Sequence, residues 1–260
     1  MAVNFIDSGA CEIDGEKMFY FREPRALINK ILETVSTVGA EKFFSSPNED
    51  IKKVRESMAE CFFTLALKRD DGRDQFLMQP KEDPPDFVLM TVQDKPISIT
   101  LDDFELVEIT ARCRSFDEME NIVQRKVNKG YSGNYNLLIF INNEKSREWS
   151  NLLYKQLGNY HPFKTVWTVH LLWYKDKKDL FGAVVNRLRP YPPRHIEAPI
   201  DGSELYKPQP VPNFMEEIKR EGKTFLSFKP DFVKGLTKEL RKINLNRLQA
   251  KNRDGEKGLS

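Results

Sequence analysis

The chain has 260 residues, of which 40% are hydrophobic and 31% are charged, and its formal net charge is +2. This composition is typical of a globular protein with enough apolar residues for a core. No apolar run approaches the roughly 20 residues of a membrane helix, and the N-terminus lacks the basic and apolar regions of a secretory signal, so we expect no membrane association.

The cysteines are odd in number and widely spaced, at Cys11, Cys61 and Cys113, and the sequence has no CxxC pair. Disulfide frameworks and structural zinc sites use cysteines that recur at characteristic short spacings. We therefore expect a reducing compartment and a cytoplasmic protein.

The first half of the chain changes from helical to strand periodicity. Apolar residues recur at helical spacing over 24–35 and again over 47–69, and Pro24 and Pro47 suit helix starts. Short β-rich runs separated by Pro, Asp or Lys turns come next: QFLMQP, PDFVLMTV, KPISIT and FELVEITAR. The sequence predicts two helices and then a meander of three or four strands.

Helices and strands alternate after the meander. Ser115 and Glu118 have capping-box spacing before a predicted helix over 116–128. Further elements are predicted from periodicity: a buried strand over 135–142, a helix over 146–160, a strand over 164–175 and a helical stretch over 179–188. This order predicts an α/β fold with a mixed sheet and helices packed against it.

The composition changes near residue 189. The next stretch, 189–212, contains seven prolines and little periodicity, which is typical of an extended connector. Two helices are predicted beyond it, near 212–220 and 230–249. The expected organisation is an α/β domain over 1–188, a Pro-rich connector over 189–212 and a basic helical segment over 213–260.

Positive charge is concentrated near the C-terminus. From Lys219 to Lys257 there are twelve Lys or Arg and five Asp or Glu, a balance of +7, which leaves −5 for the remainder of a chain whose total is +2. Such a segment either docks on a polyanion such as nucleic acid or forms the solvated face of a helix. The charge pattern leaves both interpretations open.

A carboxylate interrupts an apolar strand. Residues two apart share a face of a strand, so Glu108 and Thr110 point the same way. Asp86 opens the run PDFVLMTV, and residues 87–107 leave room for one strand, a turn and a return, so the two carboxylates are expected to meet at one end of adjacent strands. A divalent cation such as Mg²⁺ relieves the repulsion within such a pair. The alternative is that Glu108 leaves the core or is satisfied by a structural arginine.

Pro85-Asp86 followed by a strand with Glu108-x-Thr110 resembles the PD-(D/E)xK nuclease superfamily, and the form PDF then ELVEIT resembles a group of bacterial proteins with Glu-x-Thr at this place. The resemblance covers roughly 100–130 residues. It implies a restriction-endonuclease-like αβββαβ core, with extra helices at both ends in this chain. It also implies a Mg²⁺- or Mn²⁺-dependent endonuclease, a hydrolase acting on DNA or RNA, and many members form homodimers.

The resemblance assigns roles residue by residue. Asp86 and Glu108 match the metal-binding acids, and Thr110 occupies the position of the family's lysine. Because a neutral hydroxyl supplies no positive charge, either another cation substitutes or the site is disabled. The candidate substitutes are Lys95, Arg112 and Lys126. The alternative function is a catalytically silent nuclease-like domain that acts as a nucleic-acid- or protein-binding adaptor, and a plain α/β scaffold is a third option.

Several helix residues have a second interpretation. Gln124 matches a glutamine that some members carry on the helix after the Glu-x-Lys strand, and an ordinary polar flank of that helix is the alternative. Glu56 and Glu60 correspond to the family's first-helix acid, but rotation at about 100° per residue places them opposite the apolar stripe and predicts a solvent-facing position. His170 lies in an apolar run and is expected to be a core residue rather than a ligand.

Overall fold

The computed structural model describes residues 3–6, 10–13, 16–22, 24–80, 85–94, 97–129, 134–143, 145–157, 162–173, 180–202, 214–220 and 223–242. Ten strands form one sheet: β1 (Val3–Ile6), β2 (Ala10–Ile13), β3 (Glu16–Arg22), β4 (Asp74–Pro80), β5 (Phe87–Asp94), β6 (Ile97–Ile109), β7 (Asn136–Ile141), β8 (Thr165–Trp173), β9 (Leu180–Arg189) and β10 (Arg194–Asp201). The helices are α1 (Pro24–Val38), α2 (Ala40–Ser45), α3 (Glu49–Asp71), α4 (Phe116–Val127) and α5 (Ser146–Leu157). A hairpin of β11 (Met215–Arg220) and β12 (Lys223–Phe228) precedes a helix over 230–242.

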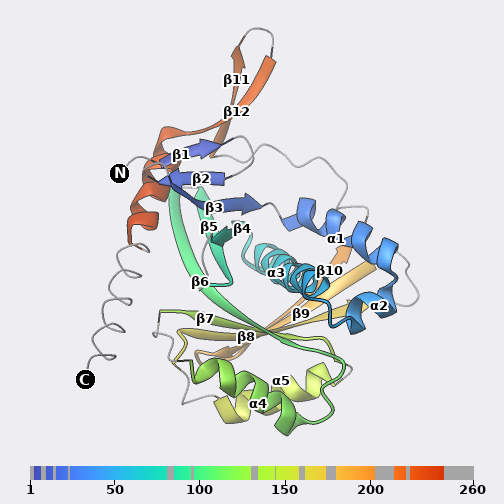
Figure 1. Ribbon diagram of the computed structural model, residues 1–260. Helices are drawn as coiled ribbons and strands as arrows, with labels where there is room; N and C mark the ends of the chain where they lie inside the picture. Colours follow the sequence, from blue (N-terminus) through green and yellow to red (C-terminus); the bar gives the residue numbers. More distant parts are fainter. Residues whose placement is uncertain are drawn as a thin grey trace.

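The strands follow one another across the sheet in chain order, from β1 to β10 (Figure 1). Strands β6, β7 and β8 are parallel, and the other neighbouring pairs are antiparallel. Helices α4 and α5 supply the crossovers that the two parallel connections require. The mixed α/β character predicted from the sequence is therefore confirmed.

The helices cover both faces of the central strands. Helices α1, α2 and α3 lie on one face, and α4 and α5 lie on the other (Figure 1). Along β6 the side chains alternate accordingly: Phe104 and Leu106 belong to the α3 cluster, whereas Val107 and Ile109 belong to the α4–α5 cluster. Burial on both faces explains why β7 is apolar at nearly every position.

Local signals fix the ends of the long helices. The Asn48 side chain accepts hydrogen bonds from the N–H groups of Asp50 and Ile51 at the start of α3, and Gly72 ends this helix in the left-handed conformation, with φ 69°. The Ser115 hydroxyl accepts from the N–H of Glu118 at 3.2 Å and caps α4. The predictions of these two helices are confirmed.

The predicted meander of three or four strands is confirmed with three strands, β4 to β6, whereas some other details differ from the prediction. The runs KPISIT and FELVEITAR form one continuous strand, β6, because Asp102 and Asp103 pair with β5 instead of making a turn. The predicted helical stretch over 179–188 is wrong where the structure describes it: residues 180–188 belong to strand β9, in which Val184 and Val185 pair with both β8 and β10.

The region after residue 189 also differs from the prediction. Part of the predicted connector is strand β10, which tolerates Pro199 because it lies at the end of the strand order. The predicted helix near 212–220 is replaced by β11. The helix over 230–242 is confirmed, and residues 243–249 lie outside the described residues. Strands β1 to β3 and helix α2 were not predicted from the sequence.

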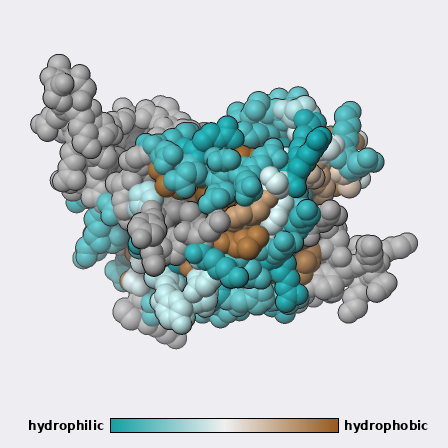
Figure 2. Space-filling model, turned by 90° about the horizontal axis from the view of Figure 1, so that it is seen from below, coloured by the Kyte–Doolittle hydropathy of each residue, from teal (hydrophilic) through white to brown (hydrophobic). Residues whose placement is uncertain are grey.

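The surface on the α4–α5 side is mostly hydrophilic, with a small apolar area near its centre (Figure 2). Partly buried apolar residues of these helices, such as Ile122 and Leu152, pack against the cluster beneath. Among the helices that the structure describes, none is long and apolar enough to cross a membrane.

Candidate functional site

The motif residues lie where β5 begins against the middle of β6. Phe87, the first residue of β5, pairs with Phe104, so the described part of β5 does not continue alongside the last residues of β6. At this edge of β6 the Asp86 carboxylate replaces a backbone partner from β5: the Leu106 N–H donates to Asp86 Oδ2 at 2.6 Å. Asp86 is thus positioned by two features: it immediately precedes β5 in the chain, and it accepts a hydrogen bond from the backbone of β6.

Glu108 faces α3 and forms a buried ion pair with Arg55. Arg55 Nε donates to Glu108 Oε1 at 2.6 Å, and a second nitrogen donates to Oε2 at 3.0 Å. The two side chains are only 2% and 3% exposed. The third guanidinium nitrogen donates to the carbonyls of Phe43 and Ser46, at 2.8 and 3.0 Å. Each nitrogen of Arg55 therefore has an acceptor inside the protein.

This pair does not fit a metal ion held jointly by Asp86 and Glu108. A carboxylate turned toward a cation would leave Arg55 buried and uncompensated, and breaking a buried pair in this way costs about 3–5 kcal/mol. Among the described residues, no group of three or more His, Cys, Asp or Glu side chains is arranged to hold a metal. The Mg²⁺ or Mn²⁺ implied by the resemblance stays a prediction that this geometry does not favour.

Asp86 belongs to a second cluster of charges, with Lys126 and Glu105. Lys126 Nζ lies 3.0 Å from Asp86 Oδ2 and 2.6 Å from Glu105 Oε2, and Glu105 is completely buried. Burial lowers the pKa of Lys126, but the charges of Asp86 and Glu105 and their hydrogen bonds outweigh it and raise the pKa above its ordinary value. Lys126 therefore carries a positive charge at neutral pH.

The structure describes two of the three predicted substitutes for the family's lysine, Lys126 and Arg112, and of these two Lys126 lies beside Asp86. Arg112 instead donates to the Ser45 carbonyl at 2.9 Å. Lys95 lies outside the described residues. Lys126 comes from α4, on the opposite face of the sheet from α3, and it reaches Asp86 where β5 no longer covers the edge of β6.

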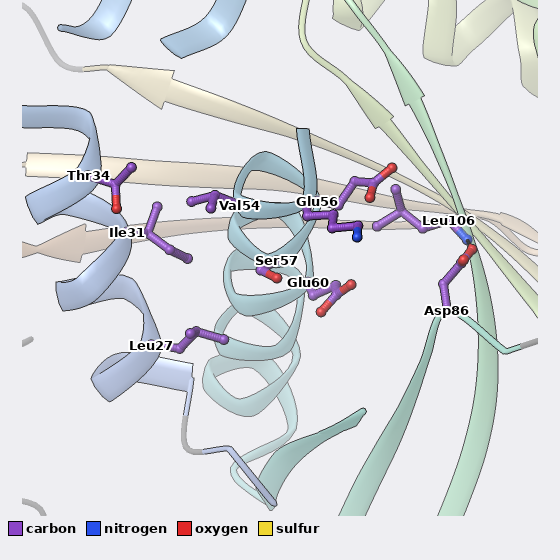
Figure 3. A pocket seen from close by; sticks show the side chains of 10 residues that line it. Leu27, Ile31, Thr34, Val54, Glu56, Ser57, Glu60, Asp86 and Leu106 are labelled. Atoms are coloured by element: carbon purple, nitrogen blue, oxygen red, sulfur yellow. Dashed lines mark hydrogen bonds between the residues drawn. The ribbon is translucent and has the colours of Figure 1, made fainter. Parts of the chain in front are cut away.

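A cavity of about 410 Å³ opens beside Asp86 (Figure 3). Its wall combines aliphatic side chains of α1, α3 and β6 with the carboxylates of Glu56, Glu60 and Asp86. The lining residues are Leu27, Ile31, Thr34, Lys53, Val54, Glu56, Ser57, Glu60, Asp86 and Leu106. Figure 3 shows Glu56 and Glu60 on the side of α3 that faces Asp86 and Leu106.

The prediction that Glu56 and Glu60 face solvent is wrong for Glu60 and only partly correct for Glu56. Glu60 is 4% exposed and the Glu56 side chain 28% exposed, because α3 is enclosed between the sheet and helices α1 and α2. Burial raises the pKa of Glu56 to about 7; Lys52 opposes this shift, and the negative charges of Asp86 and Glu108 add to it. Glu56 therefore titrates near neutral pH.

The other predicted site residues lie apart from the cavity wall. Thr110 follows β6 and accepts a backbone hydrogen bond from the Cys113 N–H at 3.1 Å through its carbonyl. Gln124 lies on α4 and donates to Asn128 Oδ1 at 3.1 Å. Neither residue lines the cavity, so the structure does not bring either one together with Asp86 there.

Sequence reasoning missed Arg55 and Glu105. Arg55 does carry a signal, because it stands four residues after Ile51 and three before Met58, inside the apolar stripe of its helix. An arginine in a buried stripe and a glutamate in a buried strand each require a partner. Glu105 precedes the motif and points to the α4 face, where no partner is recognisable from local sequence.

His170 is buried on β8, as predicted for a core residue. Burial, helped by the charges of His195 and Arg147, lowers its pKa to about 4, against an opposing effect of Glu197. The ring is therefore neutral at pH 7.

Comparisons of the chain with protein-family models, with curated proteins and with solved structures found no match.

Proposed function

We propose that this chain is a nucleic-acid-binding protein built on a nuclease-like core, in which the motif acids stabilise the fold instead of holding a catalytic metal. The observation that carries the proposal is the buried Arg55–Glu108 pair, which occupies both oxygens of the second motif acid. Of the three interpretations that the sequence leaves open, this is the catalytically silent domain.

The element order supports the nuclease-like part of the proposal. Helix α3, strands β4 to β6, helix α4 and strand β7 follow one another in the αβββαβ order that the resemblance implies, and β6 pairs with β7 in parallel. Asp86 immediately precedes β5, and Glu108 lies on β6, as expected for the two motif acids. Fold and motif position say nothing about activity by themselves.

A metal-dependent nuclease is the competing function, and one feature favours it. Lys126 lies 3.0 Å from Asp86, beside a cavity that Glu56 also lines, and a carboxyl group with a pKa of about 7 is suited to exchanging protons at neutral pH. The proposal and its competitor differ in whether phosphodiester bonds are cut.

The test combines cleavage and binding with the full chain. Supercoiled plasmid, single-stranded DNA and RNA are incubated with Mg²⁺ or Mn²⁺, and binding to the same sequences is followed by fluorescence anisotropy. We expect salt-dependent binding and no metal-dependent cutting. Cutting by the wild type that is lost in Asp86→Asn, and retained in Asp117→Asn as an exposed control on α4, would overturn the proposal in favour of the nuclease.

A further inference from the structure

The helix over 230–242 is anchored through one face. Phe232, Leu236 and Leu240 recur at intervals of four residues and are buried against the sheet residues Met78, Val88, Met90, Val92 and Ile99. Phe214 stacks on Phe232 with ring centroids 4.5 Å apart and ties the start of the hairpin to the same cluster. Because this face is fixed to the core, the opposite face of the helix is held toward solvent.

The outward face carries a row of cations. Lys234, Lys238 and Arg241 are exposed and follow each other at spacings of four and three residues, so they lie along one side of the helix. At 1.5 Å of rise per residue, the successive positions are about 6 and 4.5 Å apart along the axis. Asp231 is the acidic residue in the same groove, while Glu239 is paired with Lys242 at 2.6 Å.

The row borders a shallow groove of about 980 Å³ beside the start of β6. Ile97, Gly235 and Thr237 line it together with the charged residues. Gly235 lies beside β6, because a Cβ added to it would meet the Ile99 side chain at 3.4 Å.

We propose that Lys234, Lys238 and Arg241 form a contact surface for the phosphate backbone of nucleic acid. This inference rests on the proposed function and names where binding takes place. Cations spaced along a rigid helix match the repeated charges of a nucleic-acid strand. An anionic membrane surface fits less well, because a helix that lies in a membrane interface presents apolar side chains there, and the large apolar residues of this helix point into the core.

The experiment compares two charge reversals of equal size in the full chain. Lys234→Glu/Lys238→Glu removes two cations of the row, and Lys145→Glu/Lys155→Glu makes the same charge change at exposed positions at α5. Binding of labelled duplex DNA, single-stranded DNA and RNA is measured by anisotropy from 50 to 200 mM salt. Thermal unfolding checks that both variants fold like the wild type.

We expect the helix variant to bind at least tenfold more weakly and to lower the slope of log affinity against log salt by about two. The control variant is expected to change affinity less than threefold. Equal weakening in both variants, or none in either, overturns this surface while leaving nucleic-acid binding intact. A wild type that binds no nucleic acid overturns the proposed function itself, and binding to vesicles of anionic phospholipid alone assigns the surface to a membrane.

Discussion

The two motif acids of this chain have opposite surroundings, although they lie on neighbouring strands. The Glu108 side chain is 3% exposed and both of its oxygens accept from Arg55. The Asp86 side chain is 29% exposed, pairs with Lys126 and borders a cavity. Both carboxylates hold elements together, but burial and partners, rather than residue type, separate the one enclosed in the core from the one that borders a cavity.

A carboxylate in an apolar strand does not by itself reveal which cation neutralises it. A metal ion and a buried arginine both neutralise the charge, and both leave the same pattern in the sequence. What distinguishes them is the presence of a matching cation on an element packed against the strand. Here α3 supplies that cation from within its own buried stripe.

The largest effect is expected from Glu108→Gln. The substitution leaves the Arg55 charge buried without its counterion, so the free energy of unfolding should fall by about 3–5 kcal/mol. Urea unfolding at pH 7 measures it. Asp86→Asn, at the more exposed acid, should cost only about 1 kcal/mol. If the two variants lose equal stability, the contrast between the two acids is wrong.

Lys126→Met should have the next largest effect. Glu105 is completely buried and would lose the cation 2.6 Å away, so we expect a loss of about 3 kcal/mol. Adding Glu105→Leu should restore part of this loss, because it removes the fully buried carboxylate that Lys126→Met leaves without its cation. Chemical denaturation of the single and double variants provides the comparison, and a double variant less stable than Lys126→Met would refute a structural role for the pair.

A smaller, pH-dependent effect is expected from Glu56. Its pKa is raised from 4.5 to about 7 in the folded protein, so the folded state binds the proton more tightly than the unfolded state. Its contribution to stability is therefore present below about pH 4.5 and is lost as the pH rises through 7. Glu56→Gln should remove this pH dependence. The difference in unfolding free energy between the variant and the wild type should therefore shift in favour of the variant by about 1–2 kcal/mol from pH 5 to pH 8, a figure reduced for the partial exposure of the side chain. Thermal unfolding across this range tests it; parallel curves for wild type and variant would contradict the assignment.

The parts of the fold that could be predicted are those with local signals. Helices α3 and α4 have periodic apolar stripes and capping residues, and β7 is a short apolar run, so each was recognisable. Strand β10 was not, because its proline and its charges are typical of loops and only pairing with β9 makes it a strand. Local periodicity cannot reveal such pairing.

The candidate site was predictable only in part. The positions of Asp86 and Glu108 at adjacent strands follow from alternation and loop length. The partner of Glu108 does not, since Arg55 lies 53 residues away in the chain. The enclosure of Glu56 likewise depends on how α1 packs over α3, which a single helix pattern does not specify.

The most direct test of the structural role of Glu108 is a double-mutant cycle with Arg55. Arg55→Met, Glu108→Leu and the double variant are compared with the wild type by urea unfolding. We expect each single variant to lose about 3–5 kcal/mol of unfolding free energy and the double variant to lose less than either one, because no unpaired charge of this pair is left in the core. Additive losses, or a Glu108→Leu variant as stable as the wild type, would contradict it and return Glu108 to the role of a metal ligand.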